Sequence, residues 1–226
     1  MSLLSRFSPS NPENMEKRYY KEQAQAVERV FGIGVNELRQ MFPMDGYNLK
    51  DVGSSDPQDK YLDKLGVNAV VHTEELSIEQ FPLLVNILKS GREETTFRHF
   101  VRKAPGLNAH TILATEDRFS GKTVRLITND VELLKTISAA RFSPPPPWVA
   151  WYELGAVGAA ARQGDAEFWY GYVWDRFWNK LSLEEQALYL ENWREKTEAY
   201  ISNEDWSDWV SFVRRRDPKY REREDD

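Results

Sequence analysis

The sequence predicts an α+β protein: a mixed N-terminal part with an antiparallel sheet of about four strands, then a tryptophan-rich, all-helical C-terminal part. All eight tryptophans lie at or beyond Trp148, whereas the runs with β-strand character fall before residue 129. Between them stand four consecutive prolines, which favour extended polyproline II and cannot continue a helix. We therefore expect a mixed part over 1–143, a proline linker over 144–147, and a helical part over 148–226 packed on the first.

The N-terminal region predicts two helices and a loop. The first helix covers Pro12 to Phe31, because Asn11 can cap it, proline suits the first helical position, and apolar side chains recur every three or four residues. A pair of nearby glycines ends it. A short second helix is predicted over 35–42, and the turn-forming residues 44–60 predict a loop.

Four runs of β-branched and apolar residues predict the antiparallel sheet, and turn-forming residues separate the last three. The predicted strands cover 67–73, 96–103, 109–115 and 122–128. Ser77 and Gln80 have the spacing of a capping box for a helix that ends at Gly91, although Pro82 can shift the start of that helix to Phe81. Asn129 is the expected cap of the next helix, which ends near Ser138.

The C-terminal part predicts four helices. Their expected ranges are 148–162, 165–181, 183–201 and a last helix that begins after Ser202 or Asn203. Ser182 and Glu185 form a capping box for the third helix. The second helix is apolar around nearly its whole circumference, which is typical of a central helix in a bundle.

Composition and charge narrow the classes of function. The chain has 226 residues, 41% of them hydrophobic, and a net charge of −6, so unspecific binding to nucleic acid is disfavoured. Residues 148–213 hold 5 basic and 12 acidic side chains and therefore carry −7. There is no cysteine, which excludes disulfides and cysteine-ligated metals. With no signal-peptide pattern and no long apolar run, we expect a cytoplasmic protein that does not enter a membrane.

Several short motifs suggest chemistry but lack a required part. Ser120–Thr123 spells the end of a phosphate loop, yet Glu116 stands where its first glycine belongs. The basic residues of 92–103 alternate with Phe97 and Phe100, as on a surface for single-stranded nucleic acid, but acidic residues interrupt them. We interpret the first as a hairpin turn and the second as a solvated strand face.

The three histidines are His72, His99 and His110, and all lie in predicted strands. None has a neighbour at metal-ligand spacing, but three histidines on one sheet could cluster. We expect no catalytic residue, no metal ligand and no cofactor. The alternative is a small enzyme with a site on the sheet around His99 and His110.

The predicted helix 183–201 has the clearest two-sided pattern. At about 100° per residue, its buried stripe consists of Leu183, Ala187, Leu190, Thr197 and Ile201. A ridge of glutamates runs beside it, with Trp193 as a neighbouring exposed aromatic residue. We predict that this ridge binds a basic protein partner through Glu184, Glu191, Trp193, Glu195 and Glu198.

In general character the chain resembles the immunity proteins that bacteria make against toxins of type VI secretion and contact-dependent systems. Those proteins are typically small, cytoplasmic, often acidic and free of catalytic motifs. The likeness covers the character of the chain, above all the acidic segment 148–213, and not a motif. It implies a non-catalytic inhibitor that neutralises a cognate toxin by direct contact. A scaffold subunit is a further alternative, and the sequence leaves the oligomeric state open.

Overall fold

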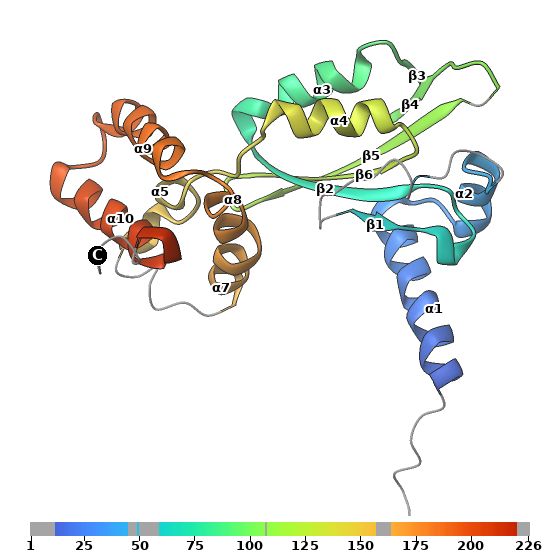
Figure 1. The fold of residues 1–226 in the computed structure, drawn as a ribbon, viewed down its shortest axis with the longest axis horizontal. Helices are drawn as coiled ribbons and strands as arrows, with labels where there is room; N and C mark the ends of the chain where they lie inside the picture. The colour runs from blue at the N-terminus through green and yellow to red at the C-terminus, as the bar shows by residue number, and fades with distance from the viewer. Residues whose placement is uncertain (1–11, 45–48, 50–58, 107, 157–163, 221–226) are drawn as a thin grey trace, which may run out of the picture. The chain divides into compact units, whose positions relative to one another are not determined.

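A computed structural model of the chain describes residues 12–44, 49, 59–106, 108–156 and 164–220. The described chain is α+β, as predicted, and contains a six-stranded antiparallel sheet in the order β1-β2-β6-β5-β4-β3 (Figure 1). The strands are β1 (Lys60–Tyr61), β2 (Val70–Ser77), β3 (Glu93–Thr96), β4 (His99–Arg102), β5 (Ala109–Arg118) and β6 (Gly121–Thr128).

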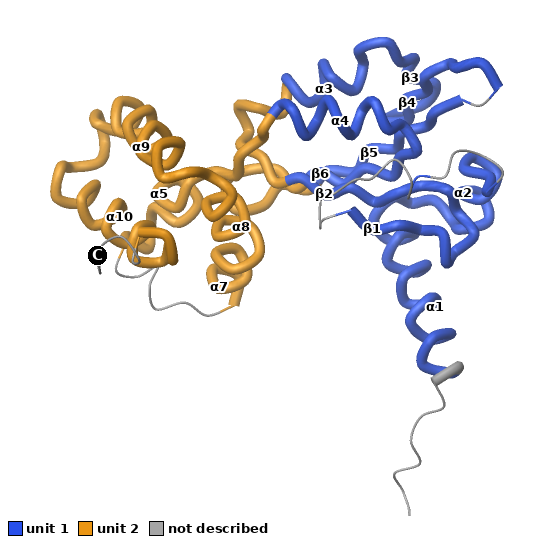
Figure 2. Tube along the Cα trace, viewed as in Figure 1, with its two compact units in different colours: residues 1–74, 83–115, 124–140 blue, residues 75–82, 116–123, 141–226 orange. Residues whose placement is uncertain are grey.

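The chain divides into two compact units, and neither is one continuous stretch (Figure 2). Unit 1 comprises 1–74, 83–115 and 124–140, and unit 2 comprises 75–82, 116–123 and 141–226. The long strands β2, β5 and β6 contribute residues to both units. The proline run belongs to unit 2.

Unit 1 has helices on both faces of its part of the sheet. Figure 1 shows α3 (Phe81–Lys89) and α4 (Val131–Ala140) along one face, and α1 (Pro12–Phe31) and α2 (Val35–Met41) on the other. On the second face, Val27, Leu38, Ile112 and Ile127 belong to one buried cluster. The predicted bounds of α1 are confirmed, because proline, the apolar spacing and the glycine after Phe31 all favour the same helix.

The sheet has two strands more than predicted, and both lie at its edges. The β3 strand is fully exposed and has the sequence Glu-Glu-Thr-Thr, so it carries no alternation of apolar and polar residues. It pairs with β4 in a hairpin whose turn includes Arg98 at φ 63°. The predicted single strand 96–103 therefore contains this turn. The two-residue β1 lies within the predicted loop 44–60 and just beyond it.

Two expected helix caps have other roles. The carboxylate of Asp130, not Asn129, accepts the N–H of Leu133 (3.2 Å) at the start of α4. The side chain of Asn129 instead accepts the backbone N–H of His110 (2.7 Å) across the sheet. Gln80 accepts the backbone N–H of Ser143 (3.0 Å), so no capping box forms there and α3 begins at Phe81.

Unit 2 is built around tryptophan, as the sequence predicts. Its described helices are α5 (Pro147–Ala150), α7 (Asp165–Trp169), α8 (Asp175–Trp178), α9 (Leu183–Thr197) and α10 (Asn203–Arg216). A π-helical turn over Tyr170–Trp174 joins α7 to α8. The buried core contains Trp148, Trp169, Trp174, Trp178 and Trp209. The predicted helix 148–162 is a short helix and a 3₁₀ turn up to residue 154, and residues 157–163 lie outside the described part.

The proline run packs against the strand ends that belong to unit 2. All four prolines are buried, and Pro145 lies beside Gly121, the first residue of β6. A Cβ atom at Gly121 would lie 2.6 Å from Pro145 Cγ and 2.7 Å from the carbonyl oxygen of Leu76. Glycine is therefore required at this position by close approach of the backbone.

Candidate functional site

A complete capping box begins α9 and defines where the helix starts. The Ser182 hydroxyl accepts the N–H of Glu185 (3.1 Å), and the Glu185 carboxylate accepts the N–H of Ser182 (2.8 Å). This confirms the cap that the sequence predicts. Arg141 also binds the Glu185 carboxylate (2.9 Å), so this glutamate serves the helix start.

The inner face of α9 is rotated from the predicted stripe. Leu190 and Thr197 are buried as expected, but Ala187 is exposed and its neighbour Gln186 is buried. Gln186 donates hydrogen bonds to the backbone oxygen of Trp178 and to the Asp217 carboxylate. These two partners accept the hydrogen bonds of the buried amide group. The helix is rotated about its axis so that Gln186, and not Ala187, faces the core.

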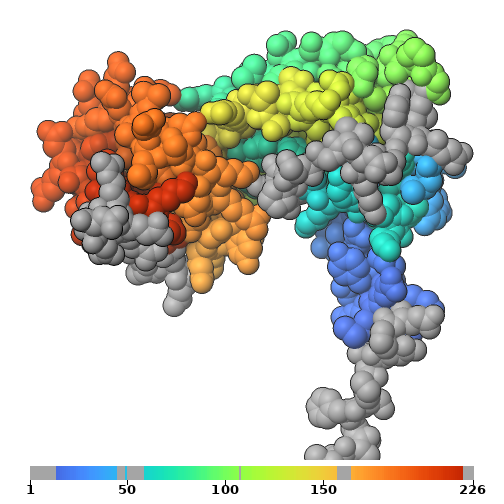
Figure 3. Space-filling model, viewed as in Figure 1, coloured from blue at the N-terminus to red at the C-terminus, as the bar shows by residue number. Residues whose placement is uncertain are grey.

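All four predicted glutamates lie on the outer, exposed face of α9. Glu184, Glu191, Glu195 and Glu198 share this face with Leu188, whose exposure is 57%. At about 100° per residue these five positions fall within an arc of about 80°. Figure 3 shows the surface of this segment in orange as part of the face drawn. We call these five residues the α9 stripe.

Trp193 is partly buried and does not belong to this stripe. Its ring packs edge-on against Trp148 (6.2 Å between centroids) and lies near Tyr189 (6.3 Å). Lys196 covers it from the solvent side, with Nζ 4.8 Å from the ring centroid. The structure thus places Trp193 at the edge of the core, and the exposed apolar side chain among the glutamates is Leu188.

The glutamates of the α9 stripe have no ion-pair partner within the described residues. Arg194, the basic residue nearest in sequence to Glu195 on its N-terminal side, is bound to the backbone oxygen of Ile201 (3.0 Å) and to Asn203. Like charges three or four residues apart, and carboxylates near a helix C-terminus, each destabilise a helix by a few tenths of a kcal/mol. The stripe therefore does not serve the stability of α9.

Two of the three histidines meet on the sheet, and all three lie in strands as predicted. His99 Nε2 on β4 lies 3.0 Å from His110 Nδ1 on β5, and both rings are half-buried. Burial lowers the pKa of both, and the neighbouring His99 lowers that of His110 further. Phe42 packs edge-on against His110 at 5.9 Å. At this distance one ring nitrogen of the pair can donate a hydrogen bond to the other.

His72 lies apart from this pair, between two carboxylates. Its Nδ1 is 2.6 Å from Asp59 and its Nε2 is 3.3 Å from Glu74. Burial lowers the pKa of His72, but the two carboxylates outweigh burial and raise it to about 9. Among the residues that the structure describes, no group of three or more His, Asp or Glu side chains is arranged to hold a metal ion.

The predicted strand-face residues of 92–103 do not form a continuous cationic surface. Arg92 and Arg102 both bind the buried carboxylate of Asp130, each at 2.8 Å. Lys103 pairs with Glu93 (2.9 Å), and Phe100 is buried. These contacts satisfy the basic side chains inside unit 1.

The segment Ser120–Thr123 is a hairpin turn leading into β6, as predicted, and no helix follows it. Lys122, which would bind phosphate in a phosphate loop, pairs instead with Asp117. Its ammonium group also lies 4.9 Å from the ring centroid of Phe81. The lysine is therefore engaged by its own unit.

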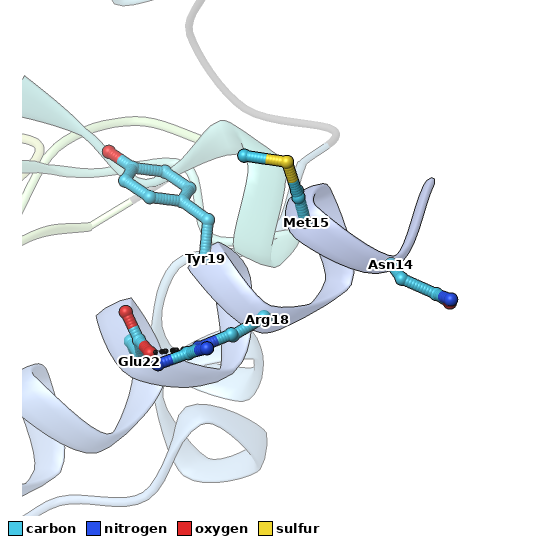
Figure 4. Close-up of a pocket in the computed structure, with 5 residues that line it drawn as sticks. All are labelled: Asn14, Met15, Arg18, Tyr19 and Glu22. Carbon is cyan, nitrogen blue, oxygen red and sulfur yellow. Dashed lines mark hydrogen bonds and ion pairs between the residues drawn. The ribbon is translucent and has the colours of Figure 1, made fainter. Parts of the chain in front are cut away.

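A shallow hollow of about 500 Å³ lies beside the N-terminal half of α1 (Figure 4). Its described lining comes from one helix and consists of Asn14, Met15, Arg18, Tyr19 and Glu22. Arg18 and Glu22 pair with each other at 2.8 Å. Among the residues that the structure describes, no second element adds polar groups to this hollow.

None of the described helices combines the length and the apolar character that crossing a membrane requires. No protein-family model, curated protein or solved structure matches the chain. Among the described residues, the α9 stripe combines exposed carboxylates that form no ion pair with an exposed leucine on one helix face.

Proposed function

We propose that the chain is a non-catalytic binding protein that holds a basic protein partner on the α9 stripe. The class that fits best is an immunity-type inhibitor, which neutralises a cognate bacterial toxin by direct contact. The observation that carries the proposal is that one helix face holds four exposed glutamates, with no ion-pair partner among the residues that the structure describes, beside the exposed Leu188.

The carboxylates of the stripe act before contact. An acidic face raises the rate at which a cationic surface meets it in a productive orientation. Because the glutamates form no ion pair within the described residues and are exposed, their field extends into solvent. A partner that itself acts on nucleic acid has a cationic site, and the stripe would occupy that site as a mimic of the anionic substrate.

Leu188 offers apolar surface that a partner can bury, which the charged side chains of the stripe do not offer. Burying a leucine side chain against a partner stabilises a complex by roughly 1.5–3 kcal/mol, and this contribution slows dissociation. Leu188 is 57% exposed, with Glu184 four residues before it and Glu191 three residues after it, so a partner that contacts these carboxylates can also bury the leucine.

The inner face of α9 keeps the stripe rigid. Leu190 and the hydrogen-bonded Gln186 are buried, and Trp193 packs on Trp148. A helix held on one side by such a core loses little conformational freedom when its other side binds. The binding surface is in this sense already organised.

The test is to recover the partner with the full-length chain as bait and then to measure association with purified components. In the variant, Glu191, Glu195 and Glu198 are each replaced by lysine. A control variant with the same change in net charge carries Glu28→Lys, Glu37→Lys and Glu132→Lys, all exposed glutamates of unit 1. We expect association to slow about tenfold or more in the α9 variant only.

Two results would contradict the proposal. One is an α9 variant that melts like the unmodified protein and binds the partner equally fast. The other is equal slowing in both variants, which would show that the partner responds to total charge and not to this face. A Leu188→Ala variant should dissociate faster while its association rate changes little.

A further inference from the structure

Two exposed tyrosines of unit 2 stand against each other near the end of α9. Tyr152 lies in the 3₁₀ turn Tyr152–Leu154, and Tyr200 follows α9 by three residues. Their ring centroids are 6.2 Å apart, the rings are inclined at 67°, and their exposures are 53% and 52%. Both rings of the pair are therefore about half exposed and are inclined to each other.

Three exposed acidic residues are neighbours of this pair, two of them along the chain. Glu153 and Glu198 are exposed and lie within two residues of Tyr152 and Tyr200 along the chain. Glu79 also lies close in space: burial raises the pKa of Tyr200, and Tyr152 and the Glu79 charge raise it further. Glu198 is shared with the α9 stripe, so the aromatic pair and the stripe meet at one end of the helix.

Other aromatic faces of unit 2 are covered by its own cations. Arg118 lies over Phe119 (4.5 Å), Lys196 over Trp193 (4.8 Å) and Arg176 over Tyr172 (5.3 Å). Within the described residues, no arginine or lysine lies over the faces of Tyr152 or Tyr200. This aromatic pair therefore has acidic neighbours and, in the part of the chain that the structure describes, no cation over its rings.

We propose that Tyr152 and Tyr200 bind an arginine or lysine side chain of the basic partner, with Glu79 and Glu198 as its counter-charges. The inference rests on the proposed function and adds to it the chemical group that the partner presents at this end of α9. Two inclined aromatic faces attract a cation through their quadrupoles, and nearby carboxylates strengthen the attraction. Tyrosine is also enriched at the centres of protein interfaces.

The test uses labelled hexa-arginine as the probe, with hexa-glutamine as the uncharged comparison, and follows fluorescence anisotropy with the full chain. We expect Tyr152→Ala and Tyr200→Ala each to weaken hexa-arginine binding about threefold to tenfold. The corresponding phenylalanine variants keep the ring faces and should bind within about twofold of the unmodified protein. Tyr19→Ala, at an exposed tyrosine of unit 1, is the matched control and should change nothing.

Glu79→Gln leaves both rings in place and should weaken binding as well, which keeps the test decisive if an alanine variant melts early. The inference is overturned if the folded alanine variants bind hexa-arginine as tightly as the unmodified protein, or if Glu79→Gln has no effect. The lysine variant of the α9 stripe separates the two proposals. If only that variant loses binding, and the tyrosine variants bind normally, the proposed function is retained and the tyrosine pair is not part of the binding site.

Discussion

At the scale of single residues, His72 is a buried side chain whose protonation the fold controls. It is buried on β2 between Asp59 and Glu74, and although burial lowers its pKa, the two carboxylates raise it to about 9, above the ordinary value of 6.5. A histidine with a raised pKa in the folded state stabilises the protein when it is protonated. Its contribution is therefore complete below pH 6.5 and is lost as the pH rises through 9.

The expected effect on stability follows from the size of this shift. A rise from 6.5 to about 9 corresponds to about 3 kcal/mol at 1.36 kcal/mol per pKa unit. We predict that the difference in melting temperature between the unmodified protein and His72→Gln is largest near pH 6 and shrinks toward pH 10. Thermal melts of both proteins across this range provide the measurement. A difference that stays constant with pH would show that His72 is not protonated in the folded state.

The residues of the α9 stripe illustrate what a helical pattern predicts. Period and spacing were sufficient to place Glu184, Glu191, Glu195 and Glu198 on one face, because all of them follow from 3.6 residues per turn. The pattern did not predict that Trp193 would pack on Trp148 or that Leu188 would be exposed. These depend on the rotation of the helix, which is set by tertiary contacts of Gln186 far along the chain.

At the scale of elements, the strands and caps that the sequence does not predict also depend on tertiary contacts that a local pattern does not reveal. The edge strand β3 has both faces exposed, so no alternation marks it. Asn129 and Asp130 are both good capping residues, and local sequence does not distinguish them. Tertiary contacts decide which of the two residues caps α4. Asn129 binds the backbone of His110 across the sheet, whereas Asp130 is held by Arg92 and Arg102 at the start of the helix.

The contact between the proline run and β6 gives a prediction at this scale. Gly121→Ala would place a methyl group 2.6 Å from Pro145 Cγ and 2.7 Å from the Leu76 carbonyl oxygen, so the strand or the prolines must move. We expect a loss of roughly 1–3 kcal/mol in the free energy of unfolding. Urea unfolding of the variant measures this loss.

Gly171→Ala is the matched control for that experiment. Gly171 lies in the π-helical turn of the same unit, and a Cβ atom there meets nothing within 4 Å. Alanine should leave stability unchanged or raise it slightly, because glycine is a poor helix former. Equal effects of the two substitutions would mean that the close approach at Gly121 does not matter to the fold.

At the scale of the whole molecule, each unit is assembled from separate stretches of chain. Residues 75–82 and 116–123 belong to unit 2, where Phe119 packs near Trp151 at 5.6 Å. A fragment of residues 148–226 lacks these stretches and the prolines. Without them, part of the tryptophan core would be exposed as an apolar patch.

We therefore predict that fragments 1–143 and 148–226 do not fold well when they are expressed separately. The second fragment should bind a hydrophobic dye and melt without a sharp transition, whereas the full chain should melt cooperatively. Calorimetry and dye fluorescence on both fragments provide the check. Two soluble fragments that each melt cooperatively would mean that the chain consists of independent domains divided at the prolines.

The most direct test of the proposed binding face is the salt dependence of association with the recovered partner. If the α9 stripe steers a cationic surface, the association rate must fall as salt rises, because the Debye length shrinks from ~10 Å at 0.1 M to ~3 Å at 1 M. We expect a steep fall in the association rate of the unmodified chain and a much flatter salt dependence when Glu191, Glu195 and Glu198 are replaced by lysine. An association rate that does not change with salt, or equal slopes for the two proteins, would contradict it.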